Sequence, residues 1–140
     1  MPLITLTTEW REDDFFNGIL RGKLASACPG TVIVNNAGGI PPLNIMHGAF
    51  VIRNTFGHYP DDTIHLVFVS SEGPADNPHL LIRAHNHWFV GANNGMFNLI
   101  LNSEPDLIIS LRNDDGDDEI TLFARTAAAL VNGQSPESLG

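Results

Sequence analysis

Apolar and polar positions along the chain follow two periods, one typical of strands and one typical of helices. Short runs rich in β-branched and other apolar residues occur repeatedly, and such runs favour strands. They cover residues 2–7, 31–34, 63–69, 80–83, 88–90 and 106–110. Between them the apolar residues recur every three or four positions, which is the period of a helix with one buried face.

Capping and stop signals delimit the helical stretches. Helices are expected from residue 12 to a stop at 29–30, from 44 to about 57, from the loop at 91–95 through residue 100, and over residues 124–131. Asn44 is a favoured amino-terminal cap, and the Pro29-Gly30 pair ends a helix. The chain therefore alternates strands with helices along most of its length.

This alternation predicts a three-layer α/β/α fold with a mostly parallel sheet covered on both faces. The strands at 80–83 and 88–90 are expected to pair as a hairpin that turns at His85-Asn86. In parallel sheets, ligands bind beyond the carboxyl ends of the strands. The loops to examine for a site are residues 8–11, 35–42, 70–78 and 91–95.

Length and charge narrow the classes of function. The 140 residues, of which 43% are hydrophobic, suit one domain over residues 1–140 with its own core. The 7 Lys and Arg against 16 Asp and Glu give a net charge of -9, which repels phosphodiester backbones, so no nucleic acid partner is expected. No apolar stretch reaches the roughly 20 residues of a membrane span. The start of the chain reads as a strand rather than an export signal.

The single cysteine, Cys28, has no partner for an intramolecular disulfide, which fits a reducing, cytoplasmic setting. It follows a helix and has no neighbouring base, so an inert, half-buried thiol is expected rather than a nucleophile. No glycine loop has the spacing that cradles phosphate groups. Dinucleotides and nucleoside triphosphates therefore have no support in the sequence.

Two segments offer metal ligands, and both have a simpler interpretation. His85 and His87 would form a metal site if a third ligand such as His79 converged on them, but a turn with solvated histidines is favoured. Residues 113–119 resemble a calcium loop in their alternating oxygen ligands and central glycine. They lack its register and flanking helices, so a solvated hairpin turn is favoured. No metal is expected.

The loop at residues 91–95 presents groups of another kind. Asn93 and Asn94 offer side-chain amides for polar recognition, and the flanking glycines allow close approach to the backbone. The alternative is an ordinary turn that opens the next helix. The residues themselves leave both interpretations open.

A family resemblance extends along nearly the whole chain. It is carried, in order, by ITLTTEW, GIPPLNI, AFVIRN, WFVGANNG and FARTAAALVNGQSPESLG. These segments resemble the amino-terminal domain of the S-adenosylmethionine hydroxide adenosyltransferase family, which also contains the fluorinase and chlorinase. The resemblance implies that water or halide displaces methionine from the 5′ carbon of S-adenosylmethionine, which is a substrate and not a cofactor. Such a substitution needs orientation and a desolvated nucleophile more than covalent help.

The resemblance also implies a homotrimer. In the family the ligand lies between the amino-terminal domain of one subunit and the carboxyl-terminal domain of the next. This chain stops at Gly140, about where the family's linker to that second domain begins. The second domain, which supplies the adenine pocket in relatives, is therefore expected to be absent from this chain, either through processing or because the protein lacks it naturally.

Several family positions carry different residues here. The aspartate that holds the ribose hydroxyls corresponds to Glu9, which keeps the charge and is one methylene longer. The water-activating aspartate, arginine and histidine correspond to Ser70, Asn77 and Asp118. The family's Thr-His-Glu-Ile segment corresponds to residues 37–40, which read Ala-Gly-Gly-Ile. Losing positioned groups of this kind commonly costs orders of magnitude in rate.

The first hypothesis is a divergent relative of the adenosine-forming hydrolases with a ligand groove lined by Glu9, Trp10, Ser70 and Asn94. The second is a module without catalysis that binds a nucleoside or assembles with itself. The third is an enzyme with altered chemistry, in which Glu9 or an aspartate of the 13–14 pair acts as acid or base, and it ranks last.

Overall fold

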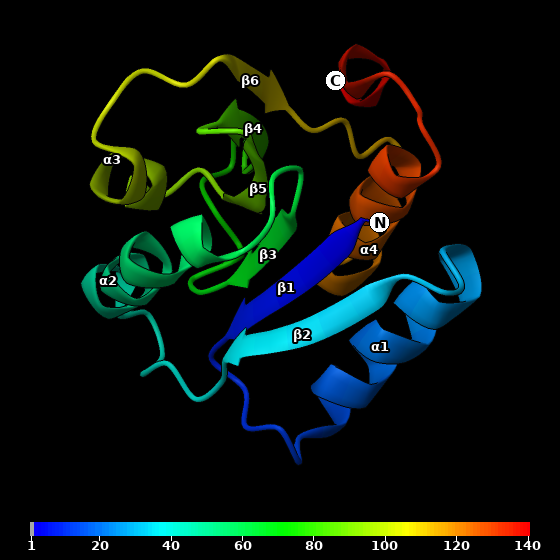
Figure 1. Cartoon of the computed structure of the whole chain (residues 1–140), viewed down its shortest axis with the longest axis horizontal. Coiled ribbons are helices and arrows are strands. Elements are labelled where there is room, and N and C mark those ends of the chain that lie inside the picture. Colours follow the sequence, from blue (N-terminus) through cyan, green and yellow to red (C-terminus); the bar gives the residue numbers. More distant parts are fainter. Residues whose placement is uncertain (1) are drawn as a thin grey trace.

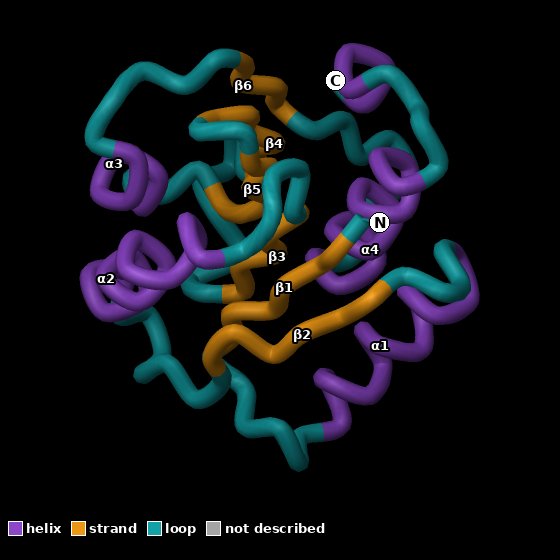
Figure 2. The backbone as a smooth tube through the Cα atoms, viewed as in Figure 1, coloured by secondary structure: helices purple, strands orange, loops and turns teal. Residues whose placement is uncertain are grey.

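The computed structural model describes residues 2–140, and its centre is one six-stranded sheet in the order β2-β1-β3-β5-β4-β6 (Figures 1 and 2). The strands are β1 (Leu3–Thr8), β2 (Val32–Ala37), β3 (Ile64–Phe68), β4 (His79–Ala84), β5 (His87–Ala92) and β6 (Leu107–Ser110). β2, β1, β3 and β5 pair in parallel, while β4 runs antiparallel to both β5 and β6. The mostly parallel sheet predicted from the sequence is confirmed.

Two helices cover each face of the sheet, so the three-layer prediction is also confirmed. α1 (Phe15–Ala27) and α4 (Glu119–Val131) lie on one side, and α2 (Ile45–Thr55) and α3 (Met96–Leu101) on the other (Figure 1). Short 3₁₀ turns follow α2, at η1 (Phe56–His58), and close the chain, at η2 (Pro136–Leu139). None of the helices within residues 2–140 combines the length and apolarity needed to cross a membrane.

The central strand β3 shows why this sequence makes a doubly covered sheet. All five of its residues are buried, as expected of a parallel strand with a helix layer on each face. Leu66 and Phe68 join the core beneath α1 and α4, and Val67 joins the core beneath α2 and α3. The alternation of side chains along the strand therefore feeds two separate cores.

The predicted hairpin of β4 and β5 is present. Ala84 pairs with His87, which leaves His85 and Asn86 as a two-residue turn. Both turn residues have positive φ, at 51° and 65°, the backbone that tight hairpin turns require.

Two of the predicted boundaries that are wrong, at β2 and α4, are explained by side-chain hydrogen bonds. β2 continues to Ala37, beyond the predicted end at residue 34, because the side chains of Asn35 and Asn36 form hydrogen bonds with residues of neighbouring elements. The Asn35 amide donates to Glu12, and the Asn36 amide donates to Thr7 and Thr55. Two polar residues that the sequence pattern assigns to a loop therefore lie inside a strand, where their side chains find hydrogen-bond partners.

The acidic run at residues 113–119 is not a hairpin turn but the connection from β6 to α4. α4 begins at Glu119, five residues before the predicted start at 124, because the Asp118 carboxylate caps it by accepting from the Thr121 N–H at 2.8 Å. The Asn113 side chain closes the preceding turn by accepting from the Asp117 N–H. These carboxylates and amides organise the backbone of the helix entry.

Replacing Asp118 with alanine should lower the free energy of unfolding by about 1 kcal/mol, because the first turn of α4 loses its cap. Urea denaturation of Asp118→Ala beside Asp115→Ala provides the measurement. Asp115 is exposed on the same run and caps no helix, so its variant should match the parent. Equal stability of all three proteins would show that the cap contributes nothing.

Candidate functional site

The carboxyl ends of β1, β3 and β5 lie side by side because these strands pair in parallel. Glu9 follows β1, Ser70 follows β3 and Asn94 follows β5. Glu9 Oε2 accepts from the Leu43 N–H at 2.7 Å and from the Ser70 N–H at 3.0 Å. One carboxylate thus joins the exit of β1, the exit of β3 and the entrance of α2.

Asn94 braces the same edge from the β5 side. Its Nδ2 donates to the carbonyls of Val69 and Ser70, each at 3.2 Å, and its Oδ1 accepts from the Met96 N–H at 3.0 Å. Ser70, which has a left-handed backbone with φ 48°, is therefore held between Glu9 and Asn94. We call Glu9, Ser70 and Asn94 the edge cluster.

Trp10 lies next to the edge cluster in sequence, but its ring turns to the α1 and α4 side of the sheet. It packs on Phe68 with ring centroids 4.8 Å apart and on Phe16 at 5.7 Å. Trp10 therefore lies beside the edge cluster on the α1 and α4 face of the sheet, while the Glu9 side chain extends toward the start of α2.

The other two residues at family positions lie apart from Ser70. Asn77 is exposed in the loop before β4, where its carbonyl accepts from the Asn93 side chain at 3.1 Å. Asp118 caps α4, and its bonds to Thr121 hold the pKa of its carboxyl below the usual value. Within residues 2–140, no hydrogen bond joins Ser70, Asn77 and Asp118 to one another.

The candidate metal ligands do not converge. His79 and His87 stand at opposite ends of the β4–β5 hairpin, where His79 pairs with Ala92 and His87 pairs with Ala84. Within residues 2–140, no three His, Cys, Asp or Glu side chains come together as a metal site. The prediction that His87 is solvated is wrong, because it is buried in the core.

His87 belongs to a buried polar row that the sequence pattern did not reveal. The Thr5 hydroxyl lies 2.7 Å from His65 Nδ1, and His65 Nε2 lies 3.0 Å from His87 Nδ1. The Phe89 ring stacks on His65 with centroids 5.1 Å apart. Burial, with a smaller contribution from His87, lowers the pKa of His65 to about 3.

Cys28 is more deeply buried than expected. Its thiol donates to the Leu24 carbonyl at 3.2 Å, so it is held against the end of α1, away from the edge cluster.

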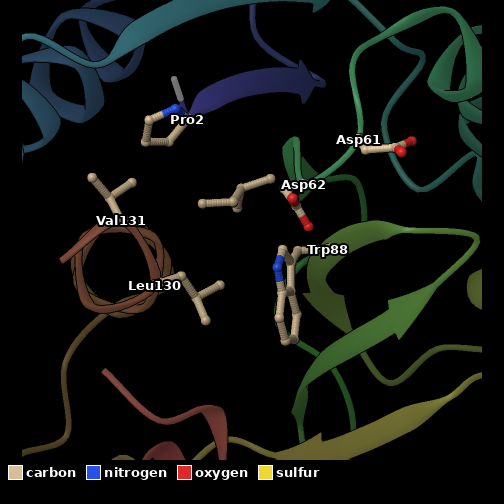
Figure 3. A pocket seen from close by; sticks show the side chains of 7 residues that line it. Pro2, Asp61, Asp62, Trp88, Leu130 and Val131 are labelled. Carbon is tan, nitrogen blue, oxygen red and sulfur yellow. The ribbon is translucent and has the colours of Figure 1, made fainter. Parts of the chain in front are cut away.

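Within residues 2–140, a cavity lies at the other end of the parallel strands, where β1, β3 and β5 begin. This cavity of about 360 Å³ is lined by Pro2, Asp61, Asp62, Ile64, Trp88, Leu130 and Val131 (Figure 3). Asp62 forms an ion pair with Arg83 at 2.8 Å. By contrast, the hollow beside Trp10 holds about 10 Å³, and Glu9, Ser70 and Asn94 do not line it.

Comparisons with known proteins identify the family to which this fold belongs. Residues 4–140 match the SAM hydroxide adenosyltransferase N-terminal domain. The chain therefore belongs to this family of α/β domains, as its sequence segments indicated.

The chain is also similar to individual proteins in sequence or in fold. An (R)-S-adenosyl-L-methionine hydrolase of Methanocaldococcus jannaschii is 23% identical over 105 residues, which cover 71% of this chain and 40% of the relative. The crystal structure of a conserved hypothetical protein from Thermus thermophilus superposes over the whole chain with a TM-score of 0.84 and 25% identity. The structure of an uncharacterized conserved protein from Thermotoga maritima does so with a TM-score of 0.86 and 18% identity.

The chain spans less than two thirds of these proteins. It covers 57% of each of the two crystallised chains.

Proposed function

We propose that this chain binds S-adenosylmethionine or adenosine at the edge cluster and Trp10, as one half of a site completed by another domain or chain. The observation that carries the proposal is the Glu9 carboxylate, which joins three loops at the carboxyl edge through Oε2 alone. No hydrogen bond from residues 2–140 reaches its Oε1. A carboxylate oxygen in this position suits the hydroxyls of a ribose.

The groups of the edge divide into supports and free contacts. Asn94 uses both amide hydrogens and its oxygen on the backbone, so its role is to hold Ser70 in place. The Ser70 hydroxyl, Glu9 Oε1 and the Trp10 indole N–H make no hydrogen bond within residues 2–140. These three groups are the ones we expect a nucleoside to contact.

Turnover with water to adenosine and methionine is expected to be slow. The residues at the water-activating positions are Ser70, Asn77 and Asp118, and the last of these is occupied in capping α4. We therefore expect measurable binding of S-adenosylmethionine even where the release of adenosine is slow.

Calorimetric titration with S-adenosylmethionine and with adenosine, followed by chromatography for released adenosine, tests both parts. Saturable binding with slow release of adenosine supports the proposal. Binding without release would leave a nucleoside-binding domain. Absence of binding to both compounds would contradict the proposal.

A second candidate function is a self-assembling module without catalysis. Large apolar side chains are exposed at the amino ends of α1 and α2, with Phe15 at 70%, Leu43 at 73% and Met46 at 75% exposure. Exposed apolar surface of this kind marks contact with another chain or domain. Sedimentation without ligand, read together with the titration, distinguishes the candidates, because this module would form a homotrimer and would bind neither S-adenosylmethionine nor adenosine.

A further inference from the structure

His79 stands at the same edge as the edge cluster. It is the first residue of β4, and because β4 runs antiparallel to β5, its start pairs with Ala92 at the carboxyl end of β5. The Asn93 N–H donates to the carbonyl of Pro78, the residue before His79, at 2.8 Å. The imidazole thus lies beside the loops that carry Ser70 and Asn94.

The surroundings of His79 determine which ring nitrogen carries hydrogen. Nε2 lies 2.5 Å from the carbonyl oxygen of Ser71. A carbonyl oxygen only accepts, so the neutral imidazole carries its hydrogen on Nε2 and leaves the lone pair on Nδ1. A backbone carbonyl that fixes one ring nitrogen in this way orients the other for proton transfer.

The Nδ1 lone pair is available. It accepts no hydrogen bond from residues 2–140, and within those residues Arg83 Nη1 is the fully buried side-chain nitrogen or oxygen without a partner. Nδ1 therefore keeps contact with solvent, although only 6% of His79 is exposed. Three other imidazoles bond to side chains: His65 and His87 bond to each other, and His85 bonds to Ser103.

A row of aromatic rings leads from His79 to Trp10, with the buried rings of Phe123 and Phe68 between them. The centroids are 5.3 Å apart between His79 and Phe123, 4.8 Å between Phe123 and Phe68, and 4.8 Å between Phe68 and Trp10. Packing of this kind restricts the imidazole to one orientation. The row also places His79 on the same face of the sheet as Trp10.

We propose that His79 is the general base of this chain and takes a proton at Nδ1 from the water that attacks the 5′ carbon of bound S-adenosylmethionine. The inference rests on the proposed function. As the water oxygen bonds to the 5′ carbon, the carbon–sulfur bond breaks and its electron pair returns to sulfur, giving methionine. The water proton passes to Nδ1, directly or through one further water, and the imidazolium, held by the Ser71 carbonyl, releases a proton to solvent.

The test compares the parent with His79→Gln, whose amide still donates to the Ser71 carbonyl, and with His85→Gln as the control at the opposite edge. Adenosine release is followed by chromatography from pH 5 to 9, and affinity by calorimetry. We expect His79→Gln to bind S-adenosylmethionine like the parent, to release adenosine roughly 100-fold more slowly, and to lose the rise of rate with pH. His85→Gln should keep both the rate and the pH profile.

Several outcomes would overturn the inference. An unchanged rate or pH profile in His79→Gln, or a parent that binds without releasing adenosine, would remove His79 as a base while leaving the proposed binding intact. Absence of binding by the parent would instead contradict the proposed function. A direct readout does not depend on turnover or on a variant that folds: nitrogen-15 NMR of the parent should show hydrogen on Nε2 of His79, and hydrogen on Nδ1 at neutral pH would overturn the assignment.

Discussion

Acidification from pH 6.5 to about 4.5 should lower the free energy of unfolding by about 2–3 kcal/mol through His65 alone. The folded state lowers the pKa of His65 from 6.5 to about 3, chiefly because the imidazole is buried. Below pH 6.5 the unfolded chain therefore takes up a proton that the folded chain refuses. The stability from the neutral imidazole is complete above pH 6.5 and decreases by about 1.4 kcal/mol per pH unit until pH falls to about 3.

The neighbouring histidine acts in the same direction. Burial lowers the pKa of His87 as well, and the carboxylate of Asp61 partly opposes this. Other charged groups near the pair are Asp62, Arg83 and His85. At pH values above those at which carboxylates titrate, the steepest decrease in the free energy of unfolding should thus come from the two histidines of the buried row of Thr5, His65 and His87.

Urea denaturation at pH 6.5, 5.5 and 4.5 measures this dependence. The variant His65→Gln retains hydrogen-bonding groups but does not titrate, so its stability should change much less over this range, although it is lower at pH 6.5. His58→Gln is the control, since His58 is exposed. Parallel pH dependences for the parent and His65→Gln would refute the prediction.

The fold was predictable because its signals are local. The buried run of β3 and the two-residue turn at His85-Asn86 each follow from a few neighbouring residues. Periodicity assigned α1 to the correct part of the chain, and the carboxyl ends of the strands identified the loops in which the edge cluster lies.

The site chemistry was less predictable because its partners are remote in sequence. Glu9 bonds to backbone groups 34 and 61 residues away, and His65 bonds to groups 60 and 22 residues away. No spacing rule connects such positions. The same limit explains the errors at β2 and α4: a pattern of polarity does not show that Asn36 bonds to Thr55 or that Asp118 begins a helix.

Replacing Glu9 with alanine should have the largest effect at the candidate site. The variant loses two charge-assisted hydrogen bonds, to Leu43 and Ser70, which should lower the free energy of unfolding by about 2 kcal/mol. The loops that carry Leu43 and Ser70 are then no longer joined. Because the free Oε1 contact also disappears, the affinity for S-adenosylmethionine should fall by at least about tenfold, or about 1.4 kcal/mol.

Glu9→Gln separates the two roles of this side chain. Its amide oxygen can still accept from Leu43 and Ser70, so most of the stability should remain, while the negative charge offered to ribose hydroxyls is lost. Hydrogen exchange at these two amides should therefore accelerate in Glu9→Ala and change little in Glu9→Gln, whereas affinity should fall in both. Glu72→Ala, which removes an exposed carboxylate from the loop after β3, is the control for charge. Equal affinities in the parent and both Glu9 variants would mean that Glu9 holds the loops together and binds no ligand.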